Sequence, residues 1–132
     1  MANSNLVKTC IGIDTSSSLG SVCVYNQKKD IFTYVEREGF DSHSKFLHQI
    51  FEEALTKAEV KVEELTNIFI GEGPGSFTGL RIGFAFCKSL SQVLKIPLTP
   101  ISSLSAYTAF SSSPTIVISD ARSELVYIGE YI

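Results

Sequence analysis

Residues 71–79 of the chain read Gly71-Glu72-Gly73-Pro74-Gly75-Ser76-Phe77-Thr78-Gly79. The short apolar run 67–71 that leads into this stretch predicts a buried strand, and the segment 80–95 that follows predicts a helix, which Pro97 ends. Backbone N–H groups at the start of such a helix can bind an anion. The alternative is a tight strand-to-helix connection whose glycines permit close packing, and the sequence leaves both interpretations open.

Neither of the two common nucleotide-binding loops fits this stretch. The Walker pattern needs a lysine after its last glycine, and Leu80 follows Gly79 here. The Rossmann pattern Gly-x-Gly-x-x-Gly fails because its third glycine would be Ser76 or Thr78, depending on where the count begins. The glycine-rich stretch is therefore a different kind of loop.

The rest of the chain predicts an α/β fold around one mixed sheet, in the order βββαβα(α)ββ. We expect strands at 9–14, 20–25, 31–35, 67–71, 115–119 and 125–132, and helices at 46–58, 80–95 and 102–110. The helix at 46–58 rests on apolar residues recurring at three- and four-residue spacing. No internal repeat interrupts this order.

Size and composition limit the class of protein. The 132 residues correspond to one domain, and 44% hydrophobic against 19% charged residues excludes a disordered chain. The net charge is -3 with no block of Lys and Arg, so we do not expect the chain to bind nucleic acid by itself. With no visible signal peptide and no apolar run of about 20 residues, we expect a cytoplasmic protein that does not contact membranes.

The segment 80–95 has an unusual surface for a helix on a sheet. Its only charges are Arg81, Lys88 and Lys95, which are seven residues apart and therefore fall on one stripe. Apolar or small groups occupy well over half of its circumference, and Gly79, Gly83 and Cys87 form a row that would let another backbone come close. Either the other helices cover this surface or a second chain does.

The string Gly73-Pro74-Gly75-Ser76-Phe77-Thr78-Gly79-Leu80-Arg81-Ile82-Gly83 closely resembles the signature of the TsaB (YeaZ) family, whose members take part in threonylcarbamoyladenosine synthesis on transfer RNA. Two flanking segments resemble the family as well: Ile13-Asp14-Thr15-Ser16, and Asp120-Ala121-Arg122 followed by Val126-Tyr127. One departure is Glu124-Leu125, where family members more often carry Gly and then Glu.

The resemblance implies a single lobe of the actin-like ATPase fold (ASKHA, ribonuclease H-like). It implies that residues 1–132 form an N-terminal lobe without the second lobe of complete members. It also implies a non-catalytic subunit without cofactor that binds TsaD, together with the ATPase TsaE, and supports threonylcarbamoyl transfer to adenosine 37. Contact with transfer RNA would then occur only within the complex, and the two long helices would bind TsaD or a second copy.

Several residues acquire expected roles from the resemblance. The family loop comprises Gly73, Pro74, Gly75, Ser76, Phe77, Thr78, Gly79, Leu80 and Arg81. Asp14, Thr15 and Ser16 would be a vestigial phosphate site; alternatively Asp14 caps the polar turn after its strand, as Asp120 would at the later turn. The expected partner interface comprises Phe46, Leu47, Ile50, Phe51, Ala54, Gly83, Phe84, Cys87, Leu90, Ser91 and Leu94. Gly83→Arg or Leu90→Asp should then abolish partner binding in a folded domain.

Other catalytic and metal chemistry finds little support. His43 and His48 are five residues apart, which on a helix directs their rings about 140° apart, so we expect no metal site. The three cysteines lack a Cys-x-x-Cys spacing, and we expect Cys10 and Cys23, which lie in apolar runs, to be buried thiols. Two alternatives remain: an enzyme that binds nucleotide through Asp14 and the 73–79 loop, and a one-lobe domain that only self-associates.

Overall fold

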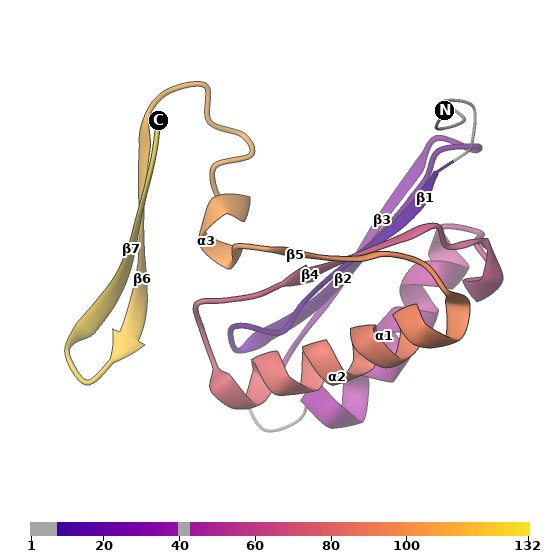
Figure 1. Cartoon of the computed structure of the whole chain (residues 1–132), viewed down its shortest axis with the longest axis horizontal. Coiled ribbons are helices and arrows are strands. Elements are labelled where there is room, and N and C mark those ends of the chain that lie inside the picture. The colour runs from indigo at the N-terminus through magenta and orange to yellow at the C-terminus, as the bar shows by residue number, and fades with distance from the viewer. Residues whose placement is uncertain (1–7, 40–42) are drawn as a thin grey trace.

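The computed structural model describes residues 8–39 and 43–132. Its centre is a five-stranded mixed sheet in the order β3-β2-β1-β4-β5, and two long helices cover one face of it (Figure 1). The strands of this sheet are β1 (Thr9–Asp14), β2 (Leu19–Asn26), β3 (Ile31–Glu38), β4 (Asn67–Gly71) and β5 (Leu98–Ile101). The helices are α1 (His43–Lys57), the one-turn η1 (Val62–Glu64), α2 (Phe77–Leu94) and the short α3 (Ser103–Ala106). The expected α/β class with a mixed sheet is confirmed.

The helix-covered face of the sheet forms the core. Alternate residues of β1, β2 and β4 point to this face, and they are fully or almost fully buried: Ile11, Ile13, Val22, Val24, Ile68 and Ile70. Each such side chain contributes roughly 1.5–3 kcal/mol by leaving water. Because side chains alternate along a strand, this single face fixes the register of the three central strands.

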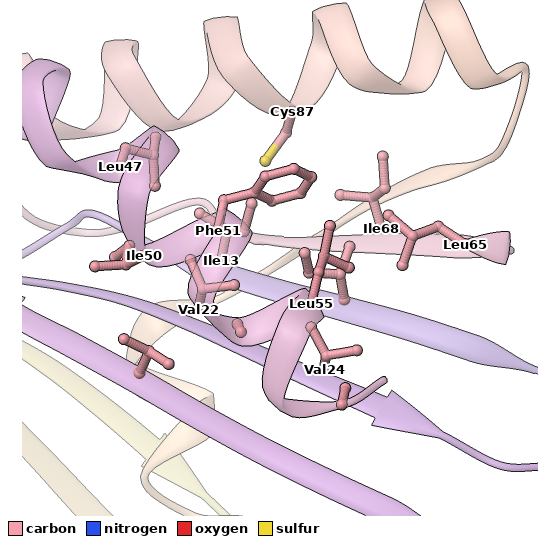
Figure 2. Close-up of a cluster of buried hydrophobic side chains, with 14 of the residues drawn as sticks. Ile13, Val22, Val24, Leu47, Ile50, Phe51, Leu55, Leu65, Ile68 and Cys87 are labelled. Atoms are coloured by element: carbon pink, nitrogen blue, oxygen red, sulfur yellow. The ribbon is translucent and has the colours of Figure 1, made fainter. Parts of the chain in front are cut away.

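The two helices meet above the sheet through aromatic and sulfur contacts. The rings of Phe51 in α1 and Phe86 in α2 pack edge to face, with centroids 5.1 Å apart. Figure 2 shows Cys87 pointing from α2 toward Phe51 in the centre of this cluster. Burial raises the pKa of the Cys87 thiol to about 12, so this cysteine is a packing residue of the core. Cys10 and Cys23 were expected to be buried, but both are only half-buried, because they lie on the opposite face of the sheet.

Two expected elements are different in the structure. Residues 98–101 form the additional strand β5, which sequence reasoning missed because Pro100 lacks an N–H donor. β5 is an edge strand paired only with β4, where a proline is tolerated. The third helix is α3, a single turn at Ser103–Ala106 instead of the expected 102–110, and hydrogen-bonded turns follow it as far as Ser111.

The last two strands, β6 (Thr115–Arg122) and β7 (Leu125–Tyr131), form a hairpin of their own. We expected them in the main sheet, but Figure 1 shows the hairpin standing apart beyond α3. Its inner side contacts α3, whereas Ile116, Ile118 and Ile128 on its other side are about two-thirds exposed. β6 and β7 therefore pair only with each other, and neither pairs with a strand of the five-stranded sheet.

The face of the sheet opposite α1 and α2 is largely open among the described residues. Phe32 and Tyr34 of β3 are 65% and 53% exposed there, because α3 is too short to extend over them. No helix in the described ranges combines the length and the apolar character needed to span a membrane.

We predict that Glu124→Gly stabilises the hairpin. Arg122, Ser123 and Glu124 in the β6–β7 turn all have positive φ, with Glu124 at 61°, a conformation that disfavours side chains and suits glycine. The gain should be about 0.5–1 kcal/mol, which slows amide hydrogen exchange of residues 115–131 roughly two- to fivefold. Glu130→Gly removes the same charge from the extended strand β7 and should speed exchange instead. Equal effects of the two substitutions would contradict the backbone explanation.

Candidate functional site

A cavity of about 390 Å³ lies between the main body of the chain and the β6–β7 hairpin. Its walls come from the turn after β1, the glycine-rich loop, α3 and the hairpin. The lining residues are Ser16, Ser17, Ser18, Pro74, Gly75, Ser76, Ser103, Leu104, Tyr107, Ser119, Asp120, Ala121, Arg122 and Tyr127. The structure thus brings Ser16 and part of the expected family loop together at one hydroxyl-rich cleft.

Asp14, at the end of β1, holds three segments together beneath this cavity. Its Oδ1 atom accepts hydrogen bonds from the Ser16 backbone N–H at 2.8 Å and from the Ser16 hydroxyl at 2.6 Å. Its Oδ2 atom accepts one from the Ser103 hydroxyl of α3 at 2.9 Å, and that hydroxyl in turn accepts from the Gly73 N–H at 3.2 Å. The prediction that Asp14 caps its turn is therefore confirmed, and both carboxylate oxygens already have partners within the chain.

The hairpin repeats the same local chemistry. Oδ1 of Asp120 accepts a hydrogen bond from the Arg122 N–H at 2.8 Å, two residues further along, as Asp14 does with Ser16. The expected similarity of the two turns is confirmed. One turn reaches the cavity from the sheet and the other from the hairpin, so the cleft has an aspartate-capped turn on each side.

The glycine-rich loop lies directly against the β1 turn. The Ser76 N–H donates to the Ser16 carbonyl at 2.6 Å, and a Cβ atom at Gly75 would collide with that same carbonyl. Ser76 also caps α2, since its hydroxyl accepts from the Gly79 N–H at 3.1 Å. The N–H groups of Gly73, Ser76 and Gly79 are thus already used within the chain. This geometry favours the close-packing interpretation of the loop.

The row of small residues on α2 packs against the chain's own sheet. The buried Thr15 hydroxyl donates to the Gly79 carbonyl at 2.7 Å, and a Cβ atom at Gly83 would collide with Thr15 Oγ1. Our expectation that Gly83→Arg leaves a folded domain is therefore wrong, because no space exists for an arginine. Leu90 is partly buried against the core, so Leu90→Asp should also destabilise the domain.

Most of the expected partner-interface residues contact the core instead of solvent. Six of them are at most 7% exposed: Phe46, Leu47, Ile50, Phe51, Ala54 and Cys87. Phe84, Leu90 and Leu94 are partly buried against the core, and Ser91 donates to the Ile96 carbonyl. These residues therefore lie on the sides of α1 and α2 that face the sheet. The sequence assigned them to an interface because an apolar helix face alone does not reveal what covers it.

The surface of α2 available to another molecule lies on the opposite side. We call it the outer face of α2 and define it by the exposed residues Phe77, Thr78, Arg81, Ala85, Lys88, Ser89, Gln92 and Val93. Phe77 is 74% and Val93 79% exposed, and the Arg81 guanidinium lies 5.5 Å from the centre of the Phe77 ring. Sequence reasoning had identified the charge stripe but not these apolar neighbours.

The described ranges contain no cluster of three or more His, Cys, Asp or Glu side chains that could hold a metal ion. His48 lies 3.2 Å from Glu52, one turn along α1. His43 begins α1, but its side chain lies outside the described part of the chain. Besides hydroxyl and backbone groups, the cleft is lined by the charged residues Asp120 and Arg122.

Comparison with known proteins places this arrangement in a family. The model of the TsaD family, described as tRNA N6-adenosine threonylcarbamoyltransferase, matches residues 36–132. The chain belongs to the TsaD family, in its TsaB/YeaZ branch. A TsaB protein of Buchnera aphidicola (subspecies Schizaphis graminum), named for tRNA threonylcarbamoyladenosine biosynthesis, is 35% identical over 127 residues. The Bacillus subtilis protein of the same name is 31% identical over 129 residues.

A solved structure agrees with this assignment. YeaZ from Pseudomonas aeruginosa superimposes with a TM-score of 0.84 at 27% identity, over 94% of this chain and 60% of that chain. The Buchnera and Bacillus relatives are matched over 60% and 55% of their lengths, by 92% and 93% of this chain. This TsaB/YeaZ-family chain therefore spans less than two-thirds of the relatives it matches.

Sequence reasoning missed some residues of the cleft. Ser103 carries the link between Asp14 and the loop, and Tyr107 and Tyr127 line the cavity, yet none of the three was expected there. The signal available was the short polar motif after each strand, Asp14-Thr15-Ser16 and Asp120-Ala121-Arg122. Ser103 lies 89 positions from Asp14, so only the fold brings the two side chains together.

We predict that Asp14→Ala lowers the free energy of unfolding by about 2–3 kcal/mol, because three hydrogen bonds to a carboxylate are lost. Urea denaturation would measure this change. Asp120→Ala is the matched control; it removes one backbone hydrogen bond on an exposed turn and should have an effect of less than about 1 kcal/mol. Unchanged stability of Asp14→Ala would contradict a structural role for the carboxylate.

Proposed function

We propose that this chain is a non-catalytic partner subunit in the synthesis of threonylcarbamoyladenosine on transfer RNA. In this role it binds TsaD, together with TsaE, in the cytoplasm and supports transfer of the threonylcarbamoyl group to adenosine 37. The similarity to proteins named TsaB supports the pathway. The observation that carries the non-catalytic role is the engagement of both Asp14 oxygens in hydrogen bonds that hold the fold together.

The arrangement of the chain suits a one-lobe subunit. We propose that residues 1–132 act as an actin-like N-terminal lobe, with the five-stranded sheet as its body and the β6–β7 hairpin as the opposite wall of the cleft. Transfer RNA would be reached only through the complex, because the chain has a net charge of -3 and no block of basic residues.

The outer face of α2 is the surface we propose for TsaD. Isolated apolar side chains on a surface are ordinary, but Phe77 and Val93 lie at the two edges of an exposed helix side that also carries Arg81 and Lys88, two cations that form no ion pair with the described residues. A rigid helix with this mixture of side chains can pack against a helix of the partner. Such docking would support the partner's active site by fixing the position of one of its helices.

We predict that Val93→Asp weakens binding to purified TsaD at least tenfold, since it would bury a charge in the interface. Ile116→Asp is the matched control: it makes the same change at an exposed site on the hairpin. Isothermal titration calorimetry would give both affinities, and circular dichroism would check that both variants are folded. Equal affinities for Val93→Asp and the unmodified chain would remove α2 from the interface.

One observation favours a second function, nucleotide binding. The cavity of about 390 Å³ lies between two aspartate-capped turns and is lined by serine hydroxyls, an arrangement that could receive phosphate. Our main proposal predicts no saturable heat when the chain alone is titrated with ATP and Mg²⁺. Binding tighter than roughly millimolar, lost in a Ser119→Glu variant that adds a carboxylate to the cavity lining, would favour the nucleotide-binding alternative.

A further inference from the structure

The short helix α3 lies between the main body of the chain and the β6–β7 hairpin. Figure 1 shows it between the end of β5 and the two strands of the hairpin. Among the described elements, its principal contacts are with β6 and β7, and not with a strand of the five-stranded sheet. The Ser102 hydroxyl at its start lies 3.5 Å from the Tyr131 hydroxyl of β7. α3 is therefore packed as part of the hairpin side of the cleft.

The buried apolar residue of α3 supports the same division. Leu104 is 6% exposed, yet it lies outside the hydrophobic cluster that the described residues form between the two long helices and the sheet. It lines the cleft instead, in the same cavity as Tyr127 of the hairpin. Because α3 takes no part in the main core, its attachment to the body depends on polar contacts.

The polar attachment of α3 to the body converges on Ser103, which is 7% exposed. Its hydroxyl donates to Oδ2 of Asp14 at 2.9 Å and accepts a hydrogen bond from the Gly73 N–H at 3.2 Å. Its backbone N–H donates to the Gly73 carbonyl at 2.8 Å. One hydroxyl thus joins the hairpin side to the end of β1 and to the glycine-rich loop. Because Ser103 is buried, water cannot readily replace these bonds.

The segment that follows α3 is tied to α3 by hydrogen bonds. The Thr108 N–H donates to the Ser105 carbonyl at 3.0 Å, and the Thr108 hydroxyl donates to the same carbonyl at 2.7 Å. The Ser111 N–H in turn donates to the Thr108 carbonyl at 2.9 Å. Only residues 112–114 separate these turns from β6, whereas on the other side β5 ends at Ile101, directly before α3 and its cap. The chain from α3 to the hairpin is therefore joined more closely to the hairpin than to the sheet.

We propose that α3 and the β6–β7 hairpin open as one unit, and that the Ser103 hydroxyl is the latch that holds this unit against the body. The movement begins after Ile101, separates Ser103 from Asp14 and Gly73, and leaves the contacts between α3 and the hairpin intact. It opens the cleft, because the hairpin forms one wall of it. A group that takes the Asp14 carboxylate away from Ser103 would release this wall, so the latch connects the chemistry at Asp14 to access to the cleft.

Amide hydrogen exchange of the whole chain tests the proposal, with separate readouts for residues 115–131 and for β1 and β2. Ser103→Ala removes both bonds of the latch hydroxyl but keeps the backbone bond to Gly73, so we expect a folded protein, which circular dichroism would check. Exchange of residues 115–131 should become about tenfold faster, because opening no longer has to break these two bonds.

Ser16→Ala is the matched control, because it removes a different hydroxyl bond to the same Asp14 carboxylate. That bond stays within the body when α3 and the hairpin leave, so exchange of the hairpin should stay within about twofold. Exchange of β1 and β2 requires global unfolding, in which both bonds are lost, and should be faster in both variants. Unchanged hairpin exchange in Ser103→Ala would overturn the latch.

Two further readouts locate the break without depending on the Ser103 variant. Tyr131→Phe removes the hydroxyl near Ser102, a contact that the opened unit retains, so hairpin exchange should not change. In the unmodified chain, the Ser103 N–H should exchange with the same urea dependence as the slowest hairpin amides, because both become exposed in one opening. Faster hairpin exchange in Tyr131→Phe would place the break between α3 and the hairpin, and protection of the Ser103 N–H as strong as that of β1 would leave α3 on the body. Either result would overturn the proposal.

Discussion

The contact between the β1 turn and the first turns of α2 is the interaction on which the rest of the structure depends. Thr15 is fully buried there, and its hydroxyl donates to the Gly79 carbonyl at 2.7 Å. The absence of a side chain at Gly83 allows this approach, and the Ser76 N–H bond to the Ser16 carbonyl closes the same junction. This junction positions the end of β1, the glycine-rich loop and α2 relative to one another, and it thereby fixes one side of the cleft.

This junction also explains why the most distinctive sequence of the chain is a structural element. A string rich in glycine and serine before a helix is typical of phosphate loops, yet here its glycines let the neighbouring turn approach, and three of its N–H groups donate within the chain. Asp14 extends the same network to α3 through Ser103. The N–H groups and the carboxylate that could bind a ligand instead form hydrogen bonds within the chain, and these bonds hold the β1 turn, the glycine-rich loop and α3 together.

Much of the architecture could be predicted from the sequence, because hydrophobic periodicity reports directly on burial. The strands 9–14 and 67–71 were predicted with their observed bounds, and both long helices were found within three residues of their ends. The prediction failed where periodicity and propensity disagree with context: Pro100 in an edge strand, and the single turn of α3. Most of the expected interface residues are buried in the core. They were assigned to an interface because the apolar side of a helix predicts burial but not which surface covers it.

The isolated hairpin has a consequence for how the molecule opens. Two paired strands alone are marginally stable in water, and β6–β7 gains tertiary support mainly from the one-turn α3. It also presents unpaired strand edges beside the exposed Ile116, Ile118 and Ile128. Local unfolding should therefore divide the chain into two cooperative units, with the hairpin opening at lower free energy than the main sheet. The free energy needed to open the cleft is then that of detaching the β6–β7 hairpin, however stable the five-stranded sheet is.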